Sequence, residues 1–189
     1  EYIALQHEDG IATLTLNRPG SLNAFNVEMV GEMIHAADQL RDEGVARALL
    51  ITGAGRAFSS GADLTGKRTD DAGAALETHF NPLLERLLAL PIPLITSVNG
   101  PAAGAGCSVA LAGDNVIASR SAYFLQAFIN IGLVPDVGST WMLPRLVGRA
   151  RAQAMMLLGV RIPAEQAAQR GIIYKAVDDD ALGSEAPAL

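Results

Sequence analysis

Two loops built almost entirely from glycine, alanine and serine follow two short apolar runs of this chain. The first loop, 58–63 (FSSGAD), follows the run 48–51 (ALLI), and the second, 99–107 (NGPAAGAGC), follows 94–98 (LITSV). Apolar runs of this length that end near glycine are typical of buried strands. Loops with so few side chains can point two backbone N–H groups at one small oxygen, which is the geometry of an oxyanion hole. The alternative, taken loop by loop, is an ordinary strand-to-helix turn.

One carboxylate downstream of these loops is a candidate base. Asp136 stands in the segment 132–138 (GLVPDVG), just before a glycine that can open a helix. A polarised carbonyl with one nearby base predicts proton transfer at the carbon next to that carbonyl. The alternative for Asp136 is that it caps the following helix, a common use of aspartate. We interpret Asp63, in the first loop, as a structural hydrogen-bonding residue and not as a base.

Length and composition exclude several classes of protein. A chain of 189 residues can bury one substantial core, so we expect a single domain over 1–189. Half of the residues are apolar, but no long run lacks polar breaks, and we expect no membrane partner. The one cysteine, Cys107, fits a reducing cytoplasm. The net charge of −6 and the lack of a basic, aromatic-interleaved stripe argue against nucleic acid. The histidines have no metal-ligand spacing, and no metal is expected.

Hydrophobic spacing predicts an α/β fold in which strand–loop–helix units recur. The predicted strands are 2–5, 11–16, 45–52, 93–98, 116–119, 123–125 and 172–177. The predicted helices are 26–40, capped by Asn26, and 74–90, 104–113, 138–146, 149–159 and 163–171. We expect 64–73 to be a mobile loop and 178–189 to be a polar connection toward an absent element.

Motifs along nearly the whole chain resemble the crotonase, or enoyl-CoA hydratase/isomerase, superfamily. The segments that carry this resemblance are 16–19 (LNRP), 22–24 (LNA), 56–64 (RAFSSGADL), 98–107, 131–136 (IGLVPD), 163–167 (PAEQA) and 170–173 (RGII). The resemblance implies a crotonase-like spiral of stacked ββα units. It also implies a homotrimer or dimer of trimers, built by C-terminal helices that this sequence lacks.

The resemblance also implies a substrate and the groups that hold it. The backbone N–H groups of Ala62 and Ala105 would grip the thioester oxygen of an acyl-CoA, with Asp136 as the catalytic base. Many members carry glycine where Ala105 stands, but a backbone donor survives that change. Coenzyme A belongs to the substrate, and no separate cofactor is implied. CoA contacts would come mostly from backbone around Asn23, Ala24, Ser60 and Leu64. The candidates for an acyl pocket are Phe80, Phe128, Leu133 and Trp141. Packing in the hydrophobic core is an equally good explanation for these four side chains.

The catalytic carboxylates separate the branches of this family. Hydratases use two glutamates, at the positions that Ser108 and Phe128 occupy here, so two-carboxylate water addition is not expected. Asp136 instead matches the lone aspartate of one-base members, most closely the ring-epoxide isomerases of phenylacetate catabolism. Those isomerases also shift the double bonds of unsaturated acyl-CoA, a reaction of fatty acid metabolism. Aromatic-CoA dehalogenases share that aspartate but pair it with tryptophan at position 128. Three hypotheses stay open: a one-base isomerase, a hydratase or other lyase with an unrecognised second acid, and a non-catalytic acyl-CoA-binding protein.

Overall fold

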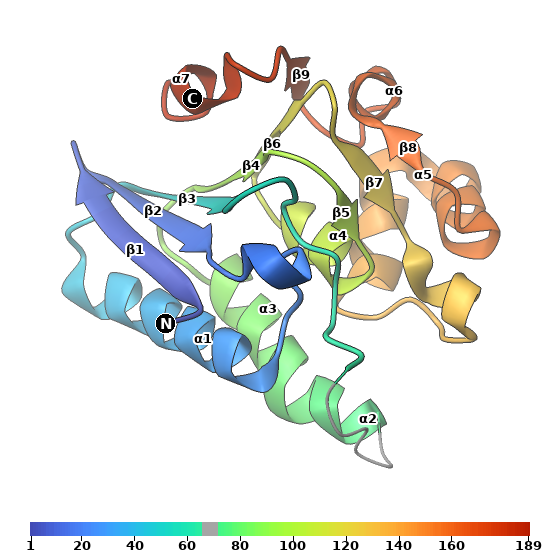
Figure 1. The fold of residues 1–189 in the computed structure, drawn as a ribbon, viewed down its shortest axis with the longest axis horizontal. Helices are drawn as coiled ribbons and strands as arrows, with labels where there is room; N and C mark the ends of the chain where they lie inside the picture. Colours follow the sequence, from blue (N-terminus) through green and yellow to red (C-terminus); the bar gives the residue numbers. More distant parts are fainter. Residues whose placement is uncertain (66–71) are drawn as a thin grey trace.

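A six-stranded sheet forms the main layer of the molecule (Figure 1). The computed structural model describes residues 1–65 and 72–189. The strands follow the order β1 (Ile3–Glu8), β2 (Ile11–Leu16), β3 (Ala48–Gly53), β4 (Leu94–Val98), β6 (Asn115–Ser119) and β9 (Lys175–Val177). Among the described pairs of this sheet, only β1 and β2 are antiparallel. Asp9 and Gly10 join these two strands in a tight turn with φ of 49° and 78°. The strands predicted at 2–5 and 11–16 are therefore confirmed, and they form a hairpin.

A second, three-stranded sheet lies across the ends of the first. It contains β5 (Ala102–Ala103), β7 (Tyr123–Leu125) and β8 (Ile162–Pro163). The chain runs from β4 into β5 and then into the helix α4 (Ala105–Ala110), and likewise from β6 into β7 and, after the 3-10 helix η3 (Ala127–Ile131), into α5 (Ser139–Leu158). This repetition is the predicted spiral of ββα units. It carries the chain after β4 and after β6 into the second sheet.

Two helices, α1 (Val27–Glu43) and α3 (Asn81–Leu88), run along one face of the main sheet (Figure 1). The Asn26 side chain accepts a hydrogen bond from the Met29 N–H at 2.9 Å, so the predicted cap of α1 is confirmed. Alternate residues of β3 serve the two faces of the sheet. Leu49 and Ile51 join the large core under α1 and α3, whereas Leu50 packs in a smaller core with Leu182 and Ala186.

The predicted helix 74–90 appears as three joined pieces. These are α2 (Ala72–Ala75), the π-helical turn η2 (Leu76–Phe80) and α3. Most of the predicted loop 64–73 lies outside the described residues, which omit 66–71. Within the described ranges, no helix is both long enough and apolar enough to cross a membrane.

The last third of the chain is mostly helical. The predicted helices 138–146 and 149–159 are the two halves of α5, which is interrupted at Gly148 by backbone angles of 75° and 163°. After α5 come β8, α6 (Ala164–Gln169) and β9. Residues 178–189, expected as a polar connection, include the short helix α7 (Leu182–Glu185), whose Leu182 is buried against the main sheet.

Candidate active site

The two small-residue loops lie directly against each other. The Phe58 and Ser59 N–H groups both donate to the Pro101 carbonyl at 3.1 Å, and the Ala103 N–H donates to the Ser59 carbonyl at 2.9 Å. A Cβ added at Gly61 would lie only 2.8 Å from the Ala103 carbonyl oxygen. The backbones can approach this closely only because glycine stands at that position.

Ala62 presents a free backbone donor at the edge of the first loop. The Phe25 N–H donates to the Gly61 carbonyl at 2.8 Å, and the Asp63 N–H donates to the Phe25 carbonyl at 2.9 Å. Successive N–H groups of an extended chain point to opposite sides, so the Ala62 N–H points away from Phe25. None of the residues that the structure describes accepts a hydrogen bond from it.

Ala105 presents a second donor close to the first. It is the first residue of α4, and the first N–H groups of a helix have no partner inside the helix. Gly104, which precedes it, has backbone angles of 52° and −126°, a conformation that favours glycine. The Cβ position at Gly61 lies 3.3 Å from the Ala105 nitrogen. The Ala105 nitrogen therefore lies beside the residue that precedes Ala62.

Asn23 holds the first loop through several hydrogen bonds. The residue is fully buried with φ of 53°, and its side-chain NH₂ donates to the Ala54 and Ala57 carbonyls at 2.9 and 2.8 Å. Its backbone carbonyl accepts from the Ser59 hydroxyl at 2.8 Å. These bonds use the Asn23 side chain inside the protein. The other backbone segments expected to contact CoA differ in exposure: Ala24 is buried, whereas Ser60 and Leu64 are exposed.

Asp63 is fully engaged by its neighbours, as expected for a structural residue. The Arg18 guanidinium donates to one carboxylate oxygen at 2.9 Å, and the Thr65 hydroxyl and N–H donate to the other at 2.6 and 3.0 Å. The Thr65 bonds, followed by Arg18, lower the pKa of Asp63 to about 2. A carboxylate with such a low pKa is a poor base, so Asp63 does not compete with Asp136 for that role.

Asp136 stands in a tight turn that leads into α5. Val137 and Gly138 follow it with φ of 46° and 73°, and the Asp136 carbonyl accepts from the Ser139 N–H at 3.0 Å. Its carboxylate makes no cap for α5, which begins after Gly138 without a side-chain bond. The Oδ1 atom of Asp136 is buried without a hydrogen-bond partner in the described structure. Burial raises the pKa of Asp136 to about 6.

Ser108 joins the turn of Asp136 to α4. Its hydroxyl lies 2.6 Å from the Ser139 hydroxyl and donates to the Asp136 carbonyl at 3.4 Å. Because Ser108 is only three residues beyond Ala105, the turn of Asp136 packs beside the helix that begins at the second donor. Sequence reasoning considered Ser108 only as a missing glutamate. Nothing in the sequence around Ser139 indicates a role at this site.

The four candidates for an acyl pocket have different surroundings. Phe80 is half-buried and meets the Phe25 ring edge-on, with centroids 6.4 Å apart. Phe128 is buried, and its carbonyl accepts from the Leu133 N–H at 3.0 Å. Leu133 and Trp141 are exposed, and the Arg145 guanidinium stacks on the Trp141 ring. Phe128 and Leu133 are thus adjacent to each other, whereas Trp141 makes its ring contact with an exposed arginine.

Cys107 is a buried thiol and not a nucleophile. It is fully buried, the Gln126 side-chain NH₂ donates to its sulfur at 3.4 Å, and burial raises the pKa of the thiol to about 12. The Gln126 Oε1 is left without a partner among the described residues. A thiol with that pKa carries almost no thiolate at neutral pH, and only the thiolate attacks.

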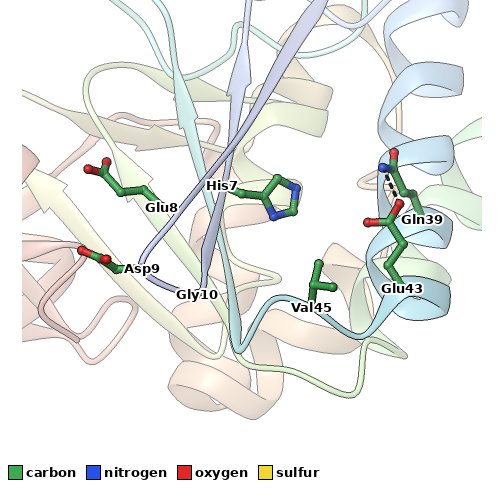
Figure 2. A pocket seen from close by; sticks show the side chains of 7 residues that line it. All are labelled: His7, Glu8, Asp9, Gly10, Gln39, Glu43 and Val45. Carbon is green, nitrogen blue, oxygen red and sulfur yellow. Dashed lines mark hydrogen bonds between the residues drawn. The ribbon is translucent and has the colours of Figure 1, made fainter.

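An open hollow of about 380 Å³ lies at the tip of the β1–β2 hairpin, beside the end of α1 (Figure 2). Figure 2 shows the Glu8 and Asp9 carboxylates extending away from α1, where the Gln39 side chain donates to Glu43 at 2.8 Å. Three of its seven lining residues, Glu8, Asp9 and Glu43, are acidic, and no lysine or arginine of the described residues lines it to bind the phosphates of a CoA thioester. None of the loop residues described above lines it.

Comparison with known proteins agrees with this geometry. A model of the enoyl-CoA hydratase/isomerase family matches residues 6–189. The 1,2-epoxyphenylacetyl-CoA isomerase of Escherichia coli (strain K12) is 48% identical over the whole chain, which covers 74% of that relative. The chain belongs to the enoyl-CoA hydratase/isomerase family.

Other family members differ in the reaction that they are named for. A probable enoyl-CoA hydratase of Rhodobacter capsulatus is 47% identical over 94% of the chain and 70% of that protein. A trans-2-decenoyl-[acyl-carrier-protein] isomerase of Streptococcus mutans is 36% identical over 93% of the chain and 69% of that protein. The crystal structure of the enoyl-CoA hydratase from Bacillus anthracis matches all of the chain and 74% of its own, with a TM-score of 0.95 and 30% identity. The crotonase fold predicted from the sequence is therefore confirmed.

Proposed function

We propose that this family member is an acyl-CoA isomerase with a single carboxylate base. The observation that carries the proposal is Asp136, a half-buried carboxylate with an unpartnered oxygen beside the helix that starts at Ala105. A buried carboxylate with a pKa of about 6 is ionised at neutral pH yet more basic than aspartate in water. Both properties suit the removal of a weakly acidic proton from carbon.

The proposed reaction moves one proton within the substrate. The thioester oxygen of a 3-enoyl-CoA accepts hydrogen bonds from the Ala62 and Ala105 N–H groups. Asp136 takes a proton from C2, and the negative charge spreads to the thioester oxygen, where the two donors stabilise it. The protonated Asp136 then returns the proton at C4, so the double bond moves from C3–C4 to C2–C3. With a ring-epoxide substrate, an enolate formed in the same way would drive opening of the epoxide.

The residues at the two hydratase glutamate positions favour isomerisation over hydration. The positions equated with the hydratase glutamates hold Ser108 and Phe128, both buried. Neither side chain can act as a carboxylate acid or base. Isomerisation needs only one base, because the same group that removes the proton returns it. The proposal therefore accounts for the aspartate at position 136 and for the residues at positions 108 and 128.

The test compares Asp136→Asn with the wild-type enzyme on 3-hexenoyl-CoA. A general base contributes about a hundred- to ten-thousandfold to rate, and we expect turnover to fall by that factor. The affinity for acyl-CoA should survive, because the proposed donors are backbone groups. The incorporation of solvent deuterium into bound substrate should fall together with turnover. Unchanged exchange and turnover in Asp136→Asn would refute the assignment of the base.

Hydration is the second candidate, because the 47% identical relative from Rhodobacter capsulatus is named a probable enoyl-CoA hydratase. The discriminating measurement is hydration of crotonyl-CoA against isomerisation of 3-hexenoyl-CoA with one preparation. We expect isomerisation to be the faster reaction. Faster hydration that Asp136→Asn leaves unaffected would favour the hydratase. Binding of acyl-CoA without deuterium exchange would instead favour a non-catalytic binding protein.

A further inference from the structure

A buried pair of serine hydroxyls connects the two halves of the candidate site. Ser108 and Ser139 are 0% and 1% exposed, and their hydroxyl oxygens lie 2.6 Å apart. The Ser108 hydroxyl also lies 3.3 Å from the Gly104 carbonyl oxygen and 3.4 Å from the Asp136 carbonyl oxygen. One hydroxyl thus reaches the segment that carries a proposed oxyanion donor and the residue that carries the proposed base.

The arrangement of acceptors sets the direction of these hydrogen bonds. Both carbonyl oxygens can only accept, so Ser108 must be the donor toward them. The Ser139 hydroxyl has Ser108 as its one partner in the described structure, so it must donate to Ser108 for its own proton to be satisfied. The chain therefore runs from Ser139 to Ser108, whose one hydroxyl proton is shared between the Gly104 and Asp136 carbonyl oxygens at 3.3 and 3.4 Å. In this direction, each of the two buried protons has an acceptor.

The Gly104 carbonyl belongs to the same peptide group as the Ala105 N–H. A peptide group is planar, so fixing the carbonyl oxygen also fixes the direction of the N–H. The Gly104 carbonyl accepts from the Ser108 N–H at 3.1 Å in addition to the Ser108 hydroxyl at 3.3 Å. Because glycine tolerates many backbone conformations, sterics alone do not hold this peptide in place. Its hydrogen bonds to Ser108 therefore help to set where the proposed oxyanion donor points.

The Asp136 side of the connection holds a strained turn. Val137 is a β-branched residue with φ of 46°, a conformation that such residues rarely adopt. The Asp136 carbonyl, just before it, accepts from the Ser139 N–H at 3.0 Å and from the Ser108 hydroxyl at 3.4 Å. Strained backbone persists where the surrounding contacts over-determine it, and such strain gathers at functional sites. The two serines supply contacts of this kind.

We propose that Ser108, anchored by Ser139, is a positioning residue that holds the Ala105 N–H and the Asp136 carboxylate at a fixed separation. This inference rests on the proposed isomerase function. Catalysis is sensitive to such a residue, because small displacements of reacting groups lower the rate steeply. Ser108 does not touch the substrate in this scheme, so its loss leaves binding in place and slows the chemical step.

The test uses Ser108→Ala with Thr96→Val as its matched control. The Thr96 hydroxyl is also fully buried and donates to a carbonyl of α4, that of Ala110 at 2.6 Å, at the end of the helix away from Ala105. Both variants remove one buried hydroxyl bound to the same helix. We expect both to lower the melting temperature. Only Ser108→Ala should lower kcat on 3-hexenoyl-CoA, by roughly three- to tenfold for one hydrogen bond, with KM unchanged.

Two further variants make the outcome decisive. Ser139→Ala breaks the same connection at its other end, so it should also lower kcat at constant KM, and it replaces Ser108→Ala if that variant fails to fold. The double variant Ser108→Ala/Ser139→Ala should lose no more than the worse single variant, because the hydroxyls act as one chain. A kcat of the serine variants equal to that of Thr96→Val would overturn the inference. In that case, a large loss in Asp136→Asn would leave the proposed function standing, whereas an unchanged Asp136→Asn would remove it.

Discussion

Replacing Asp136 by asparagine should make the folded protein more stable at neutral pH while it lowers turnover by about a hundred- to ten-thousandfold. Burial raises the pKa of the folded carboxyl from its ordinary 3.8 to about 6, so the charged form is disfavoured in the fold. Above pH 6 the folded wild type must hold this charge, whereas the unfolded chain holds it in water. Asparagine has almost the same shape and no charge, so it avoids that penalty.

The size of the effect follows from the shift in pKa. About two pKa units correspond to about 3 kcal/mol at about 1.4 kcal/mol per unit, as an upper limit. Asp136 is partly exposed, and solvent screening reduces this to roughly 1–2 kcal/mol. For a domain of this size, each kcal/mol shifts the melting temperature by about 2–4 °C. We therefore expect Asp136→Asn to melt roughly 2–8 °C above the wild type at pH 7.5.

The pH dependence has a definite sign. Below about pH 4 the carboxyl is protonated in both states, and the two proteins should differ little in stability. Between pH 4 and 6 the unfolded carboxyl loses its proton first, so the wild type loses stability relative to Asp136→Asn. Above about pH 6 the difference should level off. Thermal melts of both proteins at half-unit steps from pH 4 to 8 measure this curve.

Asp63→Asn is a control of opposite sign. The pKa of Asp63 is lowered to about 2 by its Thr65 and Arg18 partners, so its charge stabilises the fold above about pH 4. That variant should melt below the wild type at pH 7.5, and the deficit should shrink as the pH falls from about 4 to 2. If Asp136→Asn is less stable than the wild type at pH 7.5, the carboxylate has a structural partner and the account of Asp136 as an unpaired base is wrong.

Three further results are expected. The kcat/KM of the wild type should rise with pH to a plateau, with a midpoint near pH 6, where Asp136 loses its proton. A flat profile from pH 5 to 8 would exclude Asp136 as the base. Ala105→Pro removes one proposed donor at the first position of α4, where a helix tolerates proline. Turnover of this folded variant should fall by about a hundred- to a thousandfold. Ala105→Gly keeps the N–H and should lose far less turnover. Gly106→Ala would place a Cβ 2.5 Å from the Ser59 carbonyl oxygen, so both the melting temperature and turnover should fall. A variant with the melting temperature and turnover of the wild type would show that close contact between the two loops is not required.

Local patterns predicted most elements of the main sheet and the helices that cover it. Alternating and continuous apolar runs gave β2, β3 and β4, and an asparagine before an amphipathic stretch gave the start of α1. The strands β5 and β8 were missed because two residues are too short to show any period. The helix α7 was missed because its polar sequence gives no sign that Leu182 is buried.

The candidate site shows the same division between local and tertiary information. The small-residue loops predicted a pair of exposed backbone donors, and the family resemblance placed these donors at Ala62 and Ala105. The sequence could not indicate that the hydroxyls of Ser108 and Ser139 meet, since 31 residues separate them and only the packing of α5 against α4 joins them. The unpartnered oxygen of Asp136 was equally invisible, because it depends on which neighbours the fold leaves out of reach.

The glycines that allow the two loops to touch also limit which substitutions this site can accept. An oxygen held by backbone N–H groups is indifferent to the side chains at 62 and 105, whereas an added methyl at Gly61 or Gly106 would collide with the facing backbone. A saturation screen for activity should therefore be far less tolerant at 61 and 106 than at 62. In the proposed function, the groups that select the reaction stand on other segments, at positions 108 and 136. If the proposed site is correct, exchange of a single side chain there would change the chemistry without rebuilding the oxygen-binding loops, and one scaffold would then serve several reactions on the same thioester.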